Sequence, residues 1–156
     1  MQKKIFSFLF LFLFLLSSCG YEATYSKKKL SNYDFSISEI NFTGDRKVNV
    51  KMKEKLNNYI INKKNKNFKV DILSIATKAV SAKNISGDAT SFKSTVSIKV
   101  DLMMDNKLKN SFIISESFNY NNDSNKFKLK TYEKNIKNNL TETITEKLIF
   151  RLSNIK

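Results

Sequence analysis

The sequence predicts an α+β fold, a two-layer sandwich in which two helices pack on one face of a four-stranded, mixed and mostly antiparallel sheet. Two segments, 46–62 and 126–154, have apolar side chains at helical spacing. Strand-like patterns occupy 34–42 and the stretch between the two helices. Each helix has one apolar stripe and the clearest strand has one apolar face, so the expected order is β-α-β-β-β-α in two layers.

The first strand is expected over 34–42, with an irregularity near Ser38. Its apolar side chains change parity there, which predicts a β-bulge. A turn at 43–45 follows, and Asp45 is a suitable N-cap for the amphipathic helix 46–62. The residues that change parity are Phe35, Ile37, Ile40 and Phe42.

Three further strands are expected over 68–80, 90–104 and 112–120, with a polar link at 63–67 and a loop over 81–89. The strand 90–104 has the strictest alternation and therefore defines the two faces of the sheet. Its core-facing residues are Phe92, Val96, Ile98, Val100 and Leu102, and its outward residues are Lys93, Thr95, Ser97, Lys99 and Asp101. The outward face is expected to be polar, with some basic side chains.

The last helix is expected over 126–154, after a polar break at 121–125. Its apolar positions recur every four residues and so drift around a helix of 3.6 residues per turn. Its end is therefore apolar on several sides, and we expect it to be buried by its own sheet and by a partner. The residues of that end are Leu148, Ile149, Phe150 and Leu152.

The first twenty residues have the pattern of an export signal. Lys3 and Lys4 precede an apolar run at 5–16, and Leu16-Ser17-Ser18-Cys19 closes it. The run is too short for a membrane-spanning helix, which needs about 20 residues. The closing residues resemble a bacterial lipobox, so we expect a lipoprotein signal peptide at 1–18, acylation of Cys19, a tether at 19–31 and one domain at 32–156.

Composition restricts the chemistry. The formal net charge is +14, of which Lys3 and Lys4 contribute two, so anionic partners such as lipid headgroups, lipopolysaccharide phosphates or cell-wall polymers are expected. The alternative explanation of that charge is an AT-rich genome, which would produce abundant Lys, Asn and Ile. An exported chain is not expected to bind nucleic acid. The chain has no histidine, one cysteine and three glycines, so we expect no enzyme, no cofactor and no metal site.

Several features together resemble the lipopolysaccharide-assembly lipoproteins (LptE), especially those of alphaproteobacteria. They are the start Cys19-Gly20-Tyr21 with Tyr25, the turn Gly44-Asp45-Arg46, the hairpin at 83–92, and Phe118-Asn119-Tyr120 before a long final helix. The resemblance covers the whole chain in order, although no single motif is specific. Ala23 stands where the family has an early proline.

The resemblance implies an outer-membrane lipoprotein, lipid-anchored on the periplasmic side. Such lipoproteins plug the lumen of the β-barrel LptD, assist its folding, and take part in inserting lipopolysaccharide into the outer leaflet. Gly20 rather than aspartate after the cysteine agrees with outer-membrane sorting. By position, Lys83 falls in the hairpin loop, and Lys126 and Lys128 at the start of the last helix, where the family binds lipopolysaccharide.

We also assign Lys93, with its neighbour Lys99 on the polar sheet face, to the lipopolysaccharide surface. The apolar end of the last helix is assigned to the barrel through Ile149, Phe150 and Leu152. A solvated surface role is the alternative for each lysine. The alternative for the whole chain is another outer-membrane lipoprotein that serves as a cell-wall-binding or secretion-apparatus module.

Replacement Cys19→Ala should leave a precursor that keeps residues 1–18 and carries no acyl chain. The reason is that processing and anchoring both need the thiol, which is the one cysteine of the chain. Intact-mass measurement of the membrane-extracted protein checks this. A wild-type protein that retains Met1 without added acyl mass would show that the signal assignment is wrong.

Overall fold

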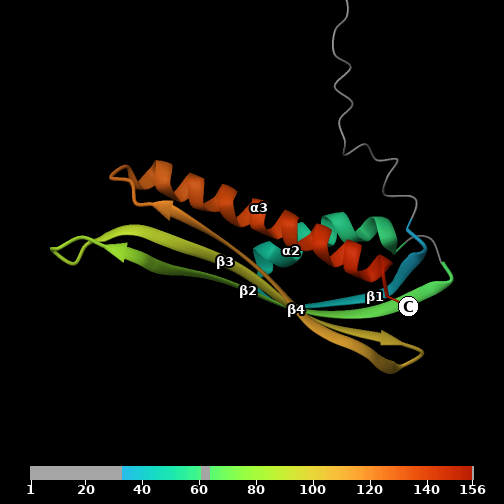
Figure 1. The fold of residues 1–156 in the computed structure, drawn as a ribbon. Helices are drawn as coiled ribbons and strands as arrows, with labels where there is room; N and C mark the ends of the chain where they lie inside the picture. Colours follow the sequence, from blue (N-terminus) through green and yellow to red (C-terminus); the bar gives the residue numbers. More distant parts are fainter. Residues whose placement is uncertain (1–32, 61–63, 156) are drawn as a thin grey trace, which may run out of the picture. The chain divides into compact units, whose positions relative to one another are not determined.

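The computed structural model describes residues 33–60 and 64–155. The predicted signal peptide, Cys19 and the tether at 19–31 lie outside these residues and stay predictions. The folded unit comprises Asp34–Lys156. Its elements are β1 (Phe35–Gly44), α2 (Arg46–Leu56), the short 3₁₀ helix η2 (Asn57–Tyr59), β2 (Lys66–Lys83), β3 (Ala89–Met104), β4 (Lys107–Asn121) and α3 (Lys126–Ser153) (Figure 1).

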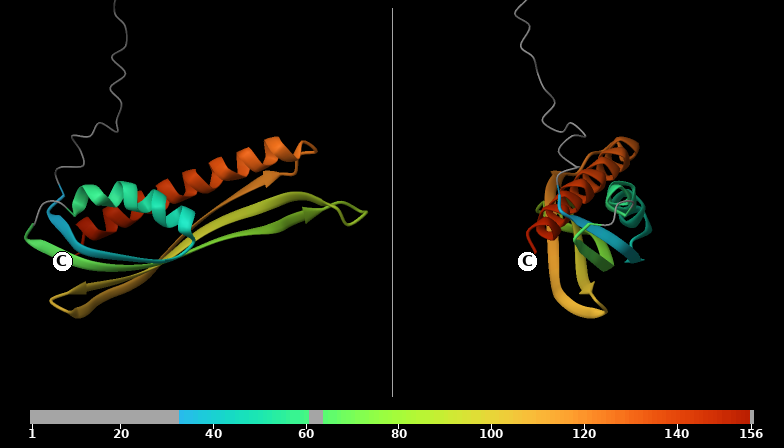
Figure 2. Two further views of the ribbon diagram at one scale, coloured as in Figure 1. Left: turned by 180° about the vertical axis from the view of Figure 1, so that it is seen from behind. Right: turned by 90° about the vertical axis from the view of Figure 1, so that its right-hand side faces the viewer.

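The predicted fold class is confirmed. The four strands form one sheet in the order β1-β2-β3-β4, in which β1 and β2 are parallel and the other two pairs are antiparallel. Both helices lie over the same face of this sheet (Figures 1 and 2). The parallel pair is joined by α2 as a crossover, and β2, β3 and β4 follow one another through tight turns.

The irregularity expected in β1 is present where the side-chain parity predicted it. The pairing with β2 shifts register between Ile37 and Glu39, so Ser38 is the extra residue. The Ser38 hydroxyl donates to the Phe68 carbonyl at 3.1 Å. The bulge lets Phe35 and Ile37 before it, and Phe42 after it, all contribute to the helix-covered face.

Helix α2 is shorter than the predicted helix 46–62. It begins as expected, because the Asp45 carboxylate accepts from the backbone N–H groups of Lys47 and Val48 at 2.9 and 3.0 Å. It ends at Leu56 and continues as the 3₁₀ turn Asn57–Tyr59. Two consecutive asparagines explain the early end, since Asn favours turns and caps over helix interiors. Positions 61–62 lie outside the described residues.

The core lies between the helices and the face predicted from the alternation of β3. Val96, Ile98, Val100 and Leu102 are each fully buried. They are joined by buried side chains from every other element, namely Phe35, Ile37, Val48, Met52, Leu56, Phe68, Val70, Ile72, Phe112, Ile114, Tyr120, Ile136, Ile144, Leu148 and Leu152. Removing this apolar surface from water is the main stabilising contribution, at about 25 cal/mol per Å².

The uncovered face of the sheet is less polar than predicted. Lys93 and Lys99 do lie on it, level with Ala79 and Leu73 of β2. However, three large apolar side chains are also exposed there, Leu73 at 42%, Ile75 at 51% and Ile113 at 66%. Leu73 and Ile113 both flank Lys99 in the register, so the face carries an apolar strip among hydroxyl and lysine side chains.

The end of α3 does not have the exposure that the barrel assignment needs. Leu148 and Leu152 are fully buried and Ile149 is 5% exposed, because the sheet and α2 cover them. Phe150 is 65% exposed. The expectation of burial on several sides is therefore met within the fold, and the assignment of Ile149 and Leu152 to a partner surface is wrong.

Replacement Val100→Asp should cost several kcal/mol of stability, because the carboxylate would have no partner in the core. The matched replacement Lys93→Asp, seven residues earlier on the uncovered face, should cost less than about 1 kcal/mol. Chemical unfolding of the two variants measures both values. Equal losses would mean that the two faces of β3 have been assigned wrongly.

Candidate functional site

The strongest candidate site lies at the end of the domain where the β2–β3 hairpin, the end of β4 and the start of α3 meet. We call this the distal end, and define it by residues 78–94 and 118–135. The opposite, proximal end holds the starts of β1 and β2, the β3–β4 turn and the end of α3 (Figures 1 and 2). The hairpin narrows at the distal end to a turn at 84–88, tied by hydrogen bonds between Asn84 and Asp88.

The start of α3 is fixed by two side-chain caps. The Asn125 side chain accepts from the Lys128 N–H at 3.0 Å, and the Asp123 carboxylate accepts from the Asn125 N–H at 2.9 Å. The Lys128 ammonium lies 3.4 Å from Asp123. The backbone hydrogen bond from Asn125, followed by Lys128 and Lys126, holds the pKa of the Asp123 carboxyl below its ordinary value.

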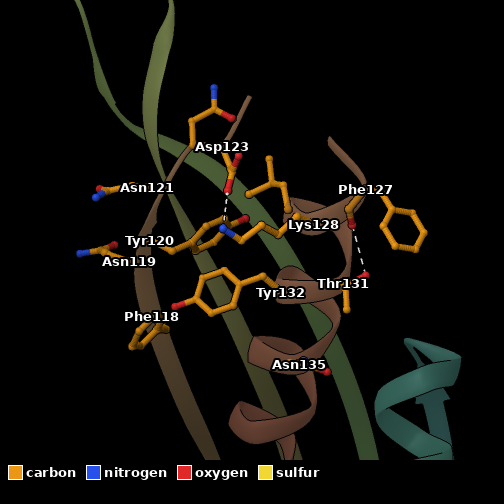
Figure 3. Close-up of a pocket in the computed structure, with 12 residues that line it drawn as sticks. Phe118, Asn119, Tyr120, Asn121, Asp123, Phe127, Lys128, Thr131, Tyr132 and Asn135 are labelled. Carbon is orange, nitrogen blue, oxygen red and sulfur yellow. Dashed lines mark hydrogen bonds and ion pairs between the residues drawn. The ribbon is translucent and has the colours of Figure 1, made fainter. Parts of the chain in front are cut away.

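A cavity of about 820 Å³ opens between the edge of β4 and the flank of α3. Figure 3 shows the rings of Phe118 and Tyr132 facing each other across it, whereas Phe127 points away. Phe118 and Tyr132 remain 47% and 46% exposed. The other lining residues are mainly amides and small polar side chains, namely Asn119, Asn121, Asn122, Thr131 and Asn135. An aromatic floor with amide groups at the rim suits an amphipathic ligand.

A polar network supports this cavity from the core side. Glu133 of α3 accepts from the Tyr120 hydroxyl at 2.9 Å and forms an ion pair with Lys78 of β2. The Lys78 ammonium also lies 3.9 Å from the centre of the Phe92 ring. Tyr120 stacks edge-on against Tyr132 with ring centres 6.0 Å apart. The network thus holds Tyr120, and through it Tyr132, at one side of the cavity.

The charge states in this network follow from opposing effects. Burial alone would raise the pKa of Glu133, but the hydrogen bonds from Lys78 and Tyr120 outweigh it, so that pKa is lowered. Burial and the hydrogen bond to Glu133 both raise the pKa of Tyr120. At neutral pH the site therefore contains a Glu133 carboxylate and a neutral Tyr120 phenol.

The four predicted lysines fall into different places. Lys126 and Lys128 lie together at the start of α3, beside the cavity. Lys83 is at the same end, but it is the last residue of β2, opposite Ala89, and the loop spans 84–88. The placement of Lys83 in the loop is therefore wrong, because β2 and β3 continue their pairing past the predicted loop boundary. Lys93 lies near this end on the uncovered face, away from α3.

Positive charge nevertheless concentrates at the start of α3. Its first nine residues carry exposed lysines at four positions, Lys126, Lys128, Lys130 and Lys134. The unsatisfied N–H groups of a helix N-terminus add a positive partial charge to the same region. Anions are therefore attracted there, by a potential that sums over the charges.

No pattern in the sequence predicts the cavity or its supporting network. Lys78 and Glu133 are 55 positions apart, and Tyr132 falls on the same four-residue spacing as the buried apolar positions of the last helix. The alternation of β2 could have placed Lys78 on the helix-covered face, where its partly exposed ammonium can pair with a carboxylate of the covering helix. The identity of that partner depends on how α3 crosses the sheet.

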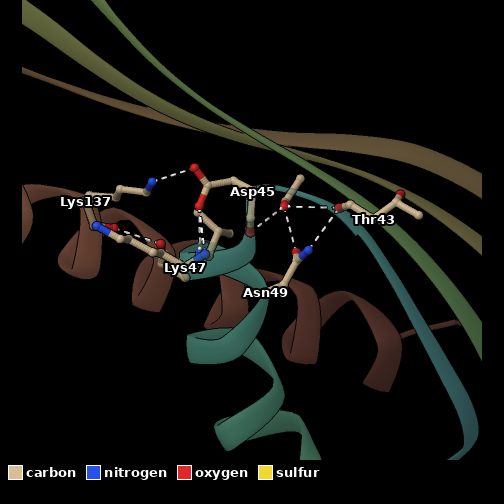
Figure 4. A network of polar contacts seen from close by, with 8 residues as sticks. Thr43, Asp45, Lys47, Asn49 and Lys137 are labelled. Carbon is tan, nitrogen blue, oxygen red and sulfur yellow. Dashed lines mark hydrogen bonds and ion pairs between the residues drawn. The ribbon is translucent and has the colours of Figure 1, made fainter.

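A second polar cluster lies near the middle of the fold (Figure 4). Asp45 caps α2 and pairs with Lys137 of α3 at 2.6 Å, while Ser74 of β2 contacts Asn49 of α2 at 2.6 Å. Burial would raise the pKa of Asp45, but hydrogen bonds from Lys137 and Val48 lower it overall. Each of these groups has a structural partner, so the cluster joins elements of the fold and is not a binding site.

Residues 33–60 and 64–155 contain no group of acidic, histidine or cysteine side chains arranged to hold a metal ion. No helix within these ranges has the length and apolar character needed to cross a membrane.

Comparisons with known proteins identify the fold. No protein-family model and no curated protein sequence matches the chain. Among solved structures, it is similar to the rare lipoprotein B of Shewanella oneidensis, with a TM-score of 0.54 and 10% identity over 74% of this chain and 97% of that one. It is also similar to a minor lipoprotein of Acinetobacter baumannii, with a TM-score of 0.54 and 11% identity over 78% and 91% of the chains.

A third similar structure is the uncharacterized lipoprotein B of Nitrosomonas europaea, with a TM-score of 0.56 and 10% identity over 79% and 87% of the chains. At these identities the likeness establishes the fold alone. The chain therefore has the fold of several solved bacterial lipoproteins, and the similarity extends over most of each of them.

Replacement Glu133→Gln should destabilise the protein by about 1 kcal/mol at pH 7, a modest value because Lys78 is 43% exposed. A carboxyl group whose pKa is lower in the folded than in the unfolded protein stabilises the fold at pH values above the unfolded-state pKa. This stabilisation is lost as the pH falls through the folded-state pKa. The difference from wild type should therefore shrink as the pH falls below about 4.5, the ordinary value for glutamate, and disappear once the pH is below the lowered pKa of folded Glu133.

Thermal unfolding at several pH values measures this difference. Glu54→Gln, at an exposed position of α2, is the control and should change stability little at any pH. A Glu133→Gln deficit that stays constant down to pH 2 would show that the carboxylate charge does not stabilise the distal end.

Proposed function

We propose that this chain is an outer-membrane lipoprotein of the LptE type, anchored through acylated Cys19. In this role it binds lipopolysaccharide and plugs an LptD-type β-barrel that inserts lipopolysaccharide into the outer leaflet. The observation that carries the proposal is the fold, which the chain shares with solved lipoproteins. The lipobox-like Leu16-Ser17-Ser18-Cys19 supports it independently, since it is a sequence motif outside the folded unit that begins at Asp34.

The distal end is the proposed lipopolysaccharide site. Lys126 and Lys128 stand beside a cavity floored by Phe118 and Tyr132, and Lys83 lies at the base of the neighbouring turn. Lysine ammonium groups bind phosphate as point charges, and aromatic rings provide apolar contact at the same place. A phosphorylated glycolipid has both of these properties. Lys93 and Lys99 lie on the uncovered face and contribute to the attraction at longer range.

The uncovered sheet face is the proposed barrel contact. It replaces the end of α3, whose Ile149 and Leu152 are buried within the fold. Leu73, Ile75 and Ile113 are exposed together on this face, and apolar groups left exposed in this way mark interaction surfaces. Because their burial does not depend on charge, the barrel contact and the lipopolysaccharide contact should respond differently to salt.

The triple replacement of Lys83, Lys126 and Lys128 by Glu should strongly lower lipopolysaccharide capture at low salt. Wild-type capture should itself fall at high salt, since exposed charges are screened beyond about 8 Å at physiological ionic strength. Co-purification of the barrel should survive the replacements. The measurement is capture of lipopolysaccharide vesicles by the membrane-extracted protein, together with identification of co-purifying proteins.

The control replaces Lys64, Lys107 and Lys109 by Glu, which makes the same change of charge with exposed residues of the proximal end. Equal loss in both triple variants would mean that net charge, not a distal site, governs binding. If native purification yields no barrel and the protein instead sediments with peptidoglycan, the cell-wall alternative replaces this proposal.

A further inference from the structure

The outer edge of β4 is the long free edge of the sheet. In the order β1-β2-β3-β4 the two outer strands are β1 and β4. β1 has ten residues and is interrupted by the bulge at Ser38. β4 has fifteen residues, and its pairing with β3 continues without a shift from Asn110 to Asn121. Within the described ranges, no strand pairs with the other side of this stretch.

The backbone groups that point outward can be identified from the ladder. The Asn122 N–H donates to the Thr90 carbonyl at 2.8 Å, so this residue pair is of the hydrogen-bonded kind. Such pairs alternate along an antiparallel ladder, which turns the even residues of β4 toward β3. The odd residues therefore present their N–H and C=O groups outward, namely Ser111, Ile113, Ser115, Ser117, Asn119 and Asn121.

From Asn110 to Asn121 this edge lacks proline and a bulge, two of the features by which proteins protect an edge strand, and the register shift of the β3–β4 pair lies before this stretch, beside Lys107 and Lys109. The chain has no proline. From Asn110 to Asn121 the one charged residue is Glu116, and it is paired with Lys147 of α3. An unprotected edge of this length is a template for the addition of another strand.

The surroundings of the edge define what it can bind. The α3 side chains that reach β4 are basic at three points, with Lys128 at the distal cavity, Lys147 on Glu116, and Arg151 4.0 Å from the centre of the Phe112 ring. The cavity between Phe118 and Tyr132 opens beside the same edge (Figure 3). A strand placed here would meet cationic groups and one apolar pocket on the helix side, and small polar side chains together with the exposed Ile113 on the other side.

A second copy of this chain fits the edge poorly. Pairing two β4 strands would bring two basic α3 flanks together, and each chain carries a net charge of +14. A negatively charged segment is attracted by the same groups.

We propose that the β4 edge binds an extended, acidic segment of a partner protein by strand addition, with one apolar side chain of that segment in the Phe118–Tyr132 cavity. Main-chain hydrogen bonds to the odd residues of β4 give affinity, while the cavity and the α3 cations give specificity. This inference goes beyond the lipopolysaccharide role, because it concerns a protein segment and can hold or fail separately.

The test compares two replacements of the same residue, one of which removes an outward backbone N–H group while the other keeps it. Ser115→Pro removes an outward N–H and leaves the ladder to β3 intact, since prolines are tolerated on the free side of edge strands. Ser115→Ala keeps that N–H and removes the same hydroxyl, so it is the matched control. The full acylated chain, held in nonionic detergent, is used to select from a phage-displayed library of random 12-residue peptides.

Selected peptides should alternate apolar and acidic residues. By fluorescence anisotropy they should bind Ser115→Pro at least tenfold more weakly than wild type and bind Ser115→Ala as wild type. Lys128→Glu should also weaken them several-fold. Thermal unfolding confirms that each variant is folded, and Ser117→Pro, which removes the next outward N–H, replaces Ser115→Pro if the latter unfolds.

Three results would overturn the proposal. One is a selection in which no peptide binds the protein more strongly than it binds empty detergent micelles. Another is a set of peptides that bind the proline variants as well as wild type, because the edge backbone would then not be used. The third is a dimer of the full chain that Ser115→Pro dissociates, because the edge would then belong to a second copy.

Discussion

The close approach of Gly44 to Ser74 is the constraint on which the rest of the fold depends. A Cβ atom on Gly44 would lie 1.9 Å from the Ser74 carbonyl oxygen, and the residue has φ +91°, which favours glycine. The contact lets the Asp45 N–H donate to that same carbonyl at 3.0 Å. Asp45 then caps α2 and pairs with Lys137 of α3. The contact between Gly44 and Ser74, with the neighbouring Asp45, thus fixes the positions of β1, α2, β2 and α3 relative to one another.

The distal end exists because the sheet is longer than the helices that pack on it. β2 has 18 residues, which at about 3.3 Å each span roughly 60 Å. α3 has 28 residues, which at about 1.5 Å each span roughly 42 Å, and α2 is much shorter. The helices therefore cannot cover the whole sheet. The hairpin emerges from under them, and the cavity and exposed aromatic side chains lie where the covered region ends.

Local patterns predicted the fold well. The alternation of β3 is a property of consecutive residues, so it identified Val100 as buried and Lys99 as exposed without knowledge of the partner strands. The parity change at Ser38 and the cap at Asp45 are local in the same sense. The end of α2 was predicted too late because the apolar positions Tyr59 and Ile60 continued the helical period past Asn57, where the chain turns.

The site was harder to predict because it depends on contacts between distant residues. Lys126 and Lys128 could be placed by their position at the start of the last helix, but Tyr132 and Phe118 line a cavity formed by two elements. The burial of Ile149 and Leu152 likewise depends on where α3 crosses the sheet, so their apolar character was mistaken for a partner surface. The outward donors of β4 require the strand register, which the sequence alone does not provide.

The account is tested most directly by site-specific photo-crosslinking in native membranes. A photoreactive amino acid replaces Tyr132 at the distal cavity, and in a second strain it replaces Leu108, which is 64% exposed near the proximal β3–β4 turn. The account predicts a lipopolysaccharide adduct from position 132 and little or none from position 108. Adducts of equal yield at both positions, or an adduct at position 108 alone, would contradict a distal lipopolysaccharide site.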